Sequence, residues 1–482
     1  MNDRDQKAKL SASEKALKIN LDHNIYGTFA EIGAGQEVAR YFFQAGAAGG
    51  TVASTISAYD MAFSDHLYGK AARYVCQKRV EQMLLKEYRS LTTILQETRP
   101  KETKFFAYAN TVSVRNFQGT NECHGWMGIR FQDKRHREND ANEIIIHVRL
   151  LDNDKISQSQ AIGVCGVNLC YGAHFLSRDM DAFVVSLMDN LSHERIEIDM
   201  ICVKGPLFAG VDNRILALKL VKNKMAHAVV FDEKGLVAQP SDLFYKKNII
   251  VLRGSFRPPT HVNMDMIRCA NEIYLQEEGH SEDNLLTITN ITLANLRAGS
   301  GQGEIDDEDF LTRVDLLGGQ GLKVLITNFT DYYRLNLYFE RFKNQRVRFV
   351  LGIYNLMALL DESAYTDLSG GILEGMGRLF DRNSKLYVYP YREEDGHIHD
   401  CHHFEYPEHL KHLYFHLLNN GSIVPITNHD PNYLSIWSRN VLEMIQKGES
   451  GWEDQVPPSV AETVMEKSLF GYPKKRKSKK KK

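Results

Sequence analysis

The chain has 482 residues, which is enough for one exceptionally large domain or two domains of ordinary size. With 43% hydrophobic and 25% charged residues, it is close to the globular average, which excludes a wholly disordered or fibrous protein. No window approaches about 18 consecutive apolar residues, and residues 1–18 are too polar for a signal peptide. We therefore expect a protein that is neither exported nor inserted in a membrane.

The cysteines indicate a reducing compartment. There are seven, an odd number, spread widely and without a Cys-x-x-Cys pair, at positions 76, 123, 165, 170, 202, 269 and 401. This pattern favours free thiols over a disulfide framework, so we expect a cytoplasmic location.

The net charge of −2 hides a strong asymmetry. The tail Lys474–Lys482 contains eight Lys or Arg residues and no acid, and without them 51 basic residues stand against 61 acidic ones, a balance of about −10. We expect residues 471–482 to form a disordered basic tail. It either contacts RNA, the ribosome or another polyanion, or serves solubility alone; nuclear targeting is a further reading for a eukaryotic source.

The N-terminal part begins with a polar leader, residues 1–19, with a short helix through Ser13–Leu17. The segment Gly33-Ala-Gly-Gln-Glu-Val-Ala-Arg looks like a dinucleotide-binding turn, which requires a strand directly before it. Asn24–Glu31 shows no convincing apolar strand run, so we interpret the glycines as sites of close helix packing.

The elements that follow alternate between helices and strands. Periodicity predicts a helix over 70–97 and strands over 105–114 and 143–151. Further strands are expected at 196–203, 226–231, 248–253, 323–328 and 346–353, and helices at 213–222, 263–277, 331–343 and 355–361. This pattern predicts an α/β fold with a mixed or mostly parallel sheet covered by helices. If there are two domains, they span residues 20–245 and 246–470.

Between these blocks, Arg297–Asp309 is rich in glycine and acidic residues. We interpret it as a flexible surface loop, with attraction of a metal ion as the alternative.

The segment Ile249–Ala270 joins an apolar strand to a helix through a tight Ser/Pro turn. The strand ends at Gly254, and Thr260 stands where it could cap a helix that begins near Asn263. Such a turn receives helix N–H groups and the positive end of the helix dipole, which predicts a phosphate site.

This turn resembles the N-terminal signature of nicotinamide or nicotinate mononucleotide adenylyltransferases, Gly-Ser-Phe-x-Pro-Pro followed by Thr/His-x-Gly-His. Val262 and Asn263 replace the Gly and the second His of that signature, which implies a nucleotidyltransferase-like protein that has lost catalysis. The stretch beginning at Leu434 loosely resembles the family's second element. Together, the resemblance implies ATP with Mg²⁺ as a ligand and phosphate contacts from Gly254, Ser255, Thr260, His261, Asn263, Ser438 and Arg439.

The whole chain also resembles a bacterial protein family of about equal length, which shares the segment starting Ile25-Tyr-Gly-Thr-Phe-Ala-Glu and the Arg-Gly-Ser-Phe-Arg-Pro turn. Its members carry names such as TonB-dependent receptor or nicotinate-nucleotide adenylyltransferase. The first name conflicts with the polar N-terminus.

Residues 397–416 hold seven of the 18 histidines. His412 and His416 are spaced i, i+4 on an expected helix and so share one face, as two metal ligands would. Zn²⁺ held by these two with His399 and His403 is one hypothesis, although no zinc-finger or zincin spacing is present. A histidine-rich surface helix is the alternative.

Two functions remain open at this point. The first is a cytoplasmic nucleotide- or phosphate-binding α/β protein, a degenerate mononucleotide adenylyltransferase in its most specific form. The second is a non-enzymatic interaction or assembly protein that contacts RNA or the ribosome through Lys474–Lys482. The sequence indicates neither whether the protein is an enzyme nor its oligomeric state.

Overall fold

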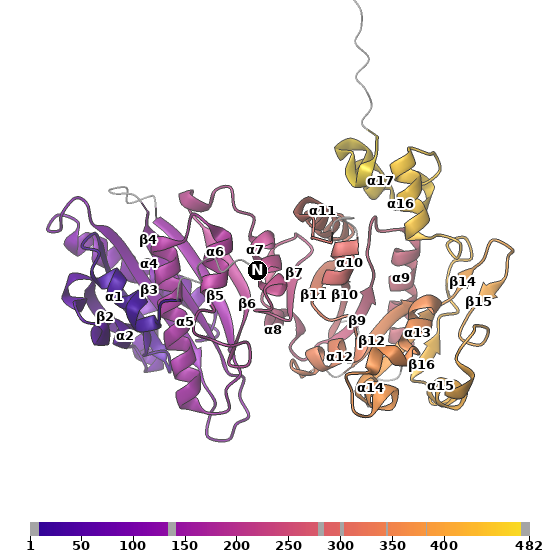
Figure 1. Ribbon diagram of the computed structural model, residues 1–482, viewed down its shortest axis with the longest axis horizontal. Coiled ribbons are helices and arrows are strands. Elements are labelled where there is room, and N and C mark those ends of the chain that lie inside the picture. The colour runs from indigo at the N-terminus through magenta and orange to yellow at the C-terminus, as the bar shows by residue number, and fades with distance from the viewer. Residues whose placement is uncertain are drawn as a thin grey trace, which may run out of the picture. The chain divides into compact units, whose positions relative to one another are not determined.

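The computed structural model describes residues 9–133, 141–277, 284–298, 303–343, 346–381 and 383–473. Two compact units divide the chain, Met1–Val229 and Val230–Lys482, and each is built on one large sheet covered by helices (Figure 1). The predicted α/β class is therefore confirmed. The sequence-based boundary between residues 245 and 246 differs from this division and stays a prediction. The tail Lys474–Lys482 lies outside the described residues.

The first unit contains a mixed six-stranded sheet in the order β2-β1-β3-β4-β5-β6. β1 pairs in parallel with β2 and β3, and the remaining neighbours are antiparallel. The strands are β1 (Ile25–Gly33), β2 (Val52–Ile56), β3 (Lys104–Ser113), β4 (His124–Gln132), β5 (Ala141–Leu150) and β6 (Ile196–Lys204). Strands β3, β4 and β5 are buried along nearly their whole length, which requires cover on both faces.

Helices provide that cover. Leu84 of α4 packs at Gly128 on one face of β4, and Ile162 of α5 packs at Gly125 on the other. The helices of this unit are α1 (Ala12–Asn20), α2 (Val38–Ala45), α3 (Met61–Tyr68), α4 (Gln77–Leu95), α5 (Lys155–Phe175), α6 (Met180–Ser186) and α7 (Asn213–Lys222). Within the described part of the chain, no helix combines the length and the apolar character that crossing a membrane requires.

The structure corrects the expectation for the Gly33 segment, because strand β1 directly precedes it and helix α2 follows. Gly27 lies so close to Phe106 of β3 that a larger residue would not fit at this position. The strand therefore has no continuous apolar run in the sequence. Glu31 accepts hydrogen bonds from the amides of Val38 and Ala39, both at 3.0 Å. The start of α2 therefore already holds a carboxylate from its own chain, in the position where a bound phosphate would lie.

The second unit contains an eight-stranded sheet in the order β16-β13-β12-β9-β10-β11-β7-β8, whose six strands from β16 to β11 are parallel. β7 and β8 pair antiparallel. The strands are β7 (Ala228–Phe231), β8 (Val237–Ala238), β9 (Asn248–Arg253), β10 (Leu285–Thr292), β11 (Lys323–Thr327), β12 (Val347–Gly352), β13 (Ser384–Tyr389) and β16 (Ile423–Pro425). A hairpin of β14 (Tyr391–Arg392) and β15 (Ile398–His399) stands apart from this sheet.

Chain order explains the arrangement. From β9 the chain builds outward on one side through β10 and β11, then returns to β9's other side and adds β12, β13 and β16. This is the order of a doubly wound sheet, with its reversal between β9 and β12.

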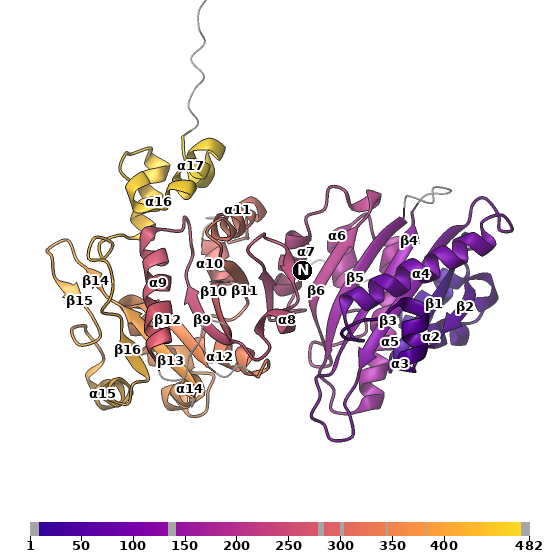
Figure 2. The same ribbon diagram turned by 180° about the vertical axis from the view of Figure 1, so that it is seen from behind.

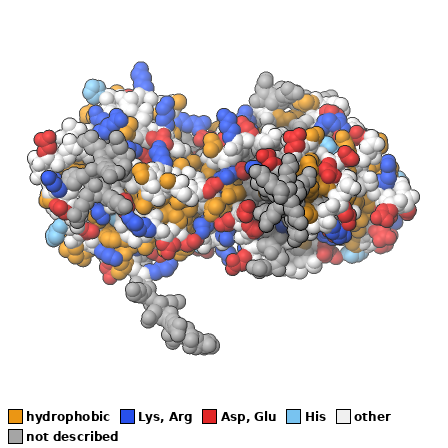
Figure 3. Space-filling model, turned by 90° about the horizontal axis from the view of Figure 1, so that it is seen from above, with side chains coloured by type: hydrophobic (Ala, Val, Ile, Leu, Met, Phe, Trp, Pro, Cys, Tyr) orange, Lys and Arg blue, Asp and Glu red, His pale blue; other side chains and the backbone are white. Residues whose placement is uncertain are grey.

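Ten α-helices are described in this unit, and in Figures 1 and 2 helix α16 lies next to one end of α9. They are α8 (Pro240–Phe244), α9 (His261–Gln276), α10 (Leu293–Ala298), α11 (Asp307–Gly318), α12 (Tyr332–Glu340), α13 (Ile353–Leu359), α14 (Gly371–Leu379), α15 (Lys411–Asn419), α16 (Ser438–Lys447) and α17 (Pro458–Lys467). Acidic and basic side chains are interspersed on the face that Figure 3 shows.

The acidic segment Arg297–Asp309 differs from the expected surface loop. Its described ends belong to α10 and α11, and residues 299–302 lie outside the description. Asp306 caps α11, since its Oδ1 accepts from the amide of Glu308 at 2.9 Å. Asp309, whose side chain is 9% exposed, forms ion pairs with Arg257 and Arg313. Asp309 is therefore used inside the fold, whereas Asp306 caps its helix from an exposed position.

Candidate ligand-binding site

The second unit has a cavity of about 680 Å³ at the carboxyl edge of its parallel strands. Residues that directly follow β9, β12 and β13 line it, together with the first turns of α9 and α16. β9 and β12 are neighbours in the sheet, but the chain winds away from them in opposite directions. Ligands of open α/β sheets bind at this reversal, and the volume lies within the range of small-molecule sites, about 300–1,000 Å³.

Arg253, the last residue of β9, supplies a partly buried positive charge to the cavity. Its Nε donates to Asn290 Oδ1 at 2.8 Å, its Nη1 donates to the carbonyl of Thr330, and its guanidinium lies 4.4 Å from the centre of the Tyr332 ring. Nη2 is buried and has no hydrogen-bond partner among the described residues. Burial lowers the pKa of Arg253, but a guanidinium stays protonated at neutral pH. The cavity is therefore lined by a guanidinium that has one nitrogen without a hydrogen bond to any described residue.

The turn after β9 is held rigidly beside this arginine. Gly254, Ser255 and Phe256 line the cavity, and Phe256 adopts a left-handed backbone with φ 48° while its side chain is buried. The buried Arg313 donates from Nη1 to the Ser255 carbonyl at 3.2 Å. Asp309 holds Arg313 in place, so the turn is supported by an ion pair from α11.

Two helices begin at the cavity. Val262 and Asn263 of α9, and Ser438 and Arg439 of α16, are among its lining residues. The N-cap residue of α16, Trp437, makes no capping hydrogen bond with its side chain in the described contacts. The free amides and the dipole at the start of α16 favour a negatively charged group there.

An aromatic wall, which we define as Tyr354, Tyr391 and Trp437, forms another side of the cavity. The ring centres lie 4.8 Å apart for the two tyrosines, 5.0 Å for Tyr354 and Trp437, and 5.4 Å for Tyr391 and Trp437. The two tyrosine hydroxyl groups lie 3.0 Å apart. Such a wall offers ring faces to an aromatic ligand.

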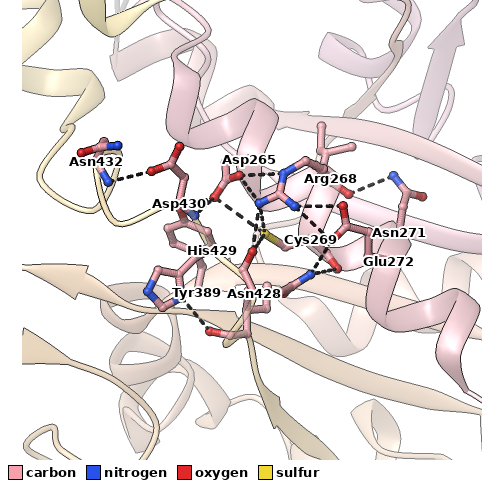
Figure 4. A network of polar contacts seen from close by, with 12 residues as sticks. Asp265, Arg268, Cys269, Asn271, Glu272, Tyr389, Asn428, His429, Asp430 and Asn432 are labelled. Carbon is pink, nitrogen blue, oxygen red and sulfur yellow. Dashed lines mark hydrogen bonds and ion pairs between the residues drawn. The ribbon is translucent and has the colours of Figure 1, made fainter.

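Beneath the cavity, a polar network ties α9 to the strand that leads to Tyr391 (Figure 4). Asp265 of α9 accepts from the Tyr389 hydroxyl at 2.6 Å, the Asp430 amide at 3.0 Å and Arg268 Nη2 at 2.6 Å. Burial alone would raise the pKa of Asp265, but these hydrogen bonds and the adjacent guanidinium lower it. Asp265 thus stays ionised and holds Tyr389, two residues before the aromatic wall.

The structure brings most of the predicted phosphate contacts to this cavity. Five line it: Gly254, Ser255, Asn263, Ser438 and Arg439. Thr260 is fully buried, and its amide and hydroxyl both donate to Asn263 Oδ1 at 3.0 Å. His261 stacks on Tyr433 at 5.2 Å. Neither is among the lining residues, and the phosphate roles of all seven stay predictions.

The four histidines predicted to bind zinc have other surroundings. His399 lies 3.1 Å from Glu393, and the exposed His403 pairs with Asp400 at 3.0 Å. His412 and His416 lie on α15, as expected, and both are exposed. In the described residues no group of three or more His, Cys, Asp or Glu side chains is placed to hold a metal ion. Zinc binding therefore gains no support from this geometry and stays a prediction.

Sequence reasoning missed Arg253, Arg313 and the aromatic wall. A signal existed only for Arg253, as a charged residue that closes the apolar run Ile-Ile-Val-Leu immediately before the turn. The wall combines residues from three separate segments, which no local pattern connects.

Comparisons with known proteins identify no family for this chain. No family model matches it, and no curated protein matches it. Among solved structures, competence/damage inducible protein CihA from Agrobacterium tumefaciens shares 14% identity, covers 33% of this chain and 93% of its own, and has a TM-score of 0.25. The competence-damaged (CinA) superfamily protein from Enterobacter cloacae shares 10% identity over 36% of this chain and 98% of its own, with a TM-score of 0.27. These scores are too low to carry an argument.

The family assignments made from the sequence are wrong by this test. Neither the adenylyltransferase family nor the bacterial family is matched by any family model or curated protein. The adenylyltransferase resemblance depended on a short turn. A turn of this kind recurs wherever a parallel strand leads into a helix, so it identifies a local geometry and no activity.

Proposed function

We propose that the second unit binds a phosphorylated aromatic small molecule, of which a nucleotide is the best probe, in the cavity between β9 and β12. The observation that carries this proposal is Arg253, which lines the cavity and whose Nη2, itself buried, has no hydrogen-bond partner among the described residues. A buried cationic donor left unsatisfied is costly, and a phosphate oxygen is the partner that a guanidinium binds best.

The remaining groups fit the same ligand. The first turn of α16 and Arg439 provide further favourable positions for negative charge. The aromatic wall provides a surface for a flat ring, and the volume of about 680 Å³ accommodates a ring together with its phosphates. Phosphate groups alone would leave the wall unused, and an apolar ring alone would leave Arg253 unpaired.

The test is calorimetric titration of the full-length protein with AMP, ATP with Mg²⁺, and inorganic pyrophosphate. The variants are Arg253→Gln, which removes the charge, and Arg253→Lys, which keeps the charge but loses the forked donors. Arg334→Gln is the matched control, because Arg334 lies in the same unit, is 46% exposed, is not a lining residue of the cavity and contacts Asp331, Asp367 and Tyr333.

We expect wild type and Arg334→Gln to bind all three probes. A lost charge-assisted hydrogen bond costs about 1.5–3 kcal/mol, so Arg253→Gln should weaken binding roughly 10- to 150-fold, with Arg253→Lys between the two. Circular dichroism shows whether the variants are folded. The proposal is overturned if wild type binds none of the probes at millimolar concentration, or if folded Arg253→Gln binds them as well as wild type does.

A further inference from the structure

One residue of the histidine-dense segment, His399, contacts a residue that lines the cavity, Tyr391. In the β14–β15 hairpin, His399 lies directly opposite Tyr391 as its antiparallel partner. The two rings stack, with centres 4.7 Å apart and planes only 5° from parallel. His399 thus covers the ring face of a residue that lines the cavity.

Further contacts hold His399 in this position. Its Nε2 lies 3.1 Å from Glu393 Oε1 but makes no hydrogen bond in the described contacts, whereas the Tyr391 hydroxyl donates to the same carboxylate oxygen at 3.1 Å. The ring of His397 meets the ring of His399 edge-on, with centres 4.7 Å apart. The hairpin is closed by the turn from Glu393 to Gly396, where the Glu393 amide donates to the His397 carbonyl at 2.9 Å.

From this geometry we infer that His399 is a positioning residue that holds Tyr391 in the aromatic wall and so sets affinity for the ring of the ligand. The inference rests on the proposed function of the cavity. It assigns His399 a role through its ring, whereas a metal ligand would act through a nitrogen lone pair. It also predicts that the two parts of the ligand have separate contacts. Arg253 and the first turns of α9 and α16 contact the phosphate, and the β14–β15 hairpin affects only the binding of the ring.

The experiment compares AMP with inorganic pyrophosphate on four full-length proteins by calorimetry: wild type, His399→Ala, His399→Phe and His403→Ala. Phenylalanine keeps a flat ring against Tyr391 but cannot pair with Glu393. His403 is the matched control, because it belongs to the same segment, is 70% exposed and contacts Asp400 and the ring of His402 but no lining residue of the cavity in the described contacts.

We expect His399→Ala to weaken AMP binding about two- to tenfold, the usual worth of an aromatic pair, and to leave pyrophosphate binding unchanged. His399→Phe should restore AMP affinity to within about twofold of wild type, and His403→Ala should match wild type for both probes. Loss of AMP and pyrophosphate affinity together in His399→Ala, or no loss at all, would overturn the positioning role. So would a His399→Phe variant as weak as His399→Ala.

These outcomes are distinct from failure of the proposed function. If wild type binds neither AMP nor pyrophosphate, the cavity is not a phosphate site and both proposals fall. If wild type binds both with equal affinity and His399→Ala changes neither, phosphate binding stands and the ring-positioning role of His399 is refuted.

Discussion

Replacing Glu277 with glutamine should destabilise the second unit strongly at neutral pH and much less in acid. Glu277 ends α9, and its carboxylate accepts from Arg348 Nη2 at 2.5 Å, the Tyr387 hydroxyl at 2.6 Å and Lys385 Nζ at 3.2 Å. Arg348 is 3% exposed and Glu277 is 17% exposed. Burial alone would raise the pKa of Glu277, but these partners lower it from 4.5 to about 2.

The magnitude follows from this shift. A difference of about 2.5 pKa units at about 1.36 kcal/mol each gives roughly 3 kcal/mol of stability at pH 7. Because the folded-state pKa is depressed, this contribution is complete above the unfolded value of 4.5 and is lost as the pH falls from 4.5 toward 2. By the same linkage, about 1 kcal/mol should remain at pH 3. In Glu277→Gln, Arg348 would also lack its buried counter-charge.

Urea unfolding followed by tryptophan fluorescence measures this effect. The chain has three tryptophans, and Trp126 alone lies in the first unit, so a Trp126→Phe background restricts the signal to Trp437 and Trp452 of the second. Glu408→Gln is the control, because the Glu408 side chain is 82% exposed and its pair with Lys411 contributes little. The reasoning is refuted if Glu277→Gln costs less than about 1 kcal/mol at pH 7, or if its cost is the same at pH 7 and pH 3.

Three further outcomes are expected. Asp309→Asn should destabilise the second unit by about 3 kcal/mol in urea unfolding, because it leaves the buried Arg313 without its carboxylate; a loss below about 1 kcal/mol would contradict this. Deletion of Lys474–Lys482 should abolish binding to a generic single-stranded RNA and remove its salt dependence, about 0.7 in log–log slope per phosphate, with no change in melting temperature; RNA binding that persists with the same slope would assign the contact to another surface. Elemental analysis of protein purified without chelators tests the zinc prediction: stoichiometric zinc that disappears in His412→Ala would support it, and less than about 0.2 zinc per chain would remove it.

Elements with a clear pattern could be predicted from the sequence. The strand Asn248–Arg253 and the helix Asn213–Lys222 have the predicted bounds, since each carries a run or periodicity of apolar residues between evident ends. Helix α5 was missed because it is buried on almost every side. Residues as different as Gln158, Asn168 and Gly166 are buried along it, so no polar face marks the helical period.

The residues of the candidate site could be predicted only in part from the sequence, for a different reason. The turn at Gly254 is formed by consecutive residues. Its glycine, prolines and capping threonine therefore predict a strand that leads into a helix. The aromatic wall depends on which strands are neighbours, and Tyr354 and Tyr391 meet only because β12 and β13 pair in the sheet. Pairing of strands separated by a helix is a property of the whole fold, and a single sequence does not display it.

Arginines of the second unit differ in whether a carboxylate pairs with them. This difference separates the arginines that maintain the fold from the one proposed to bind a ligand. Arg313 is matched by Asp309, Arg348 by Glu277 and Arg268 by Asp265, so each of these guanidinium groups has a carboxylate partner. Arg253 has no ion pair among the described contacts, although its side chain is partly buried and its Nη2 is fully buried. Asp331 favours the charged form of Arg253 from a distance, but no carboxylate pairs with the guanidinium in the described contacts. Arg253 would gain that pair from a bound anion. Its position at the reversal between β9 and β12, with the start of α16 and the aromatic wall around the same cavity, is the reason to expect that anion to be the phosphate of a ring-bearing ligand.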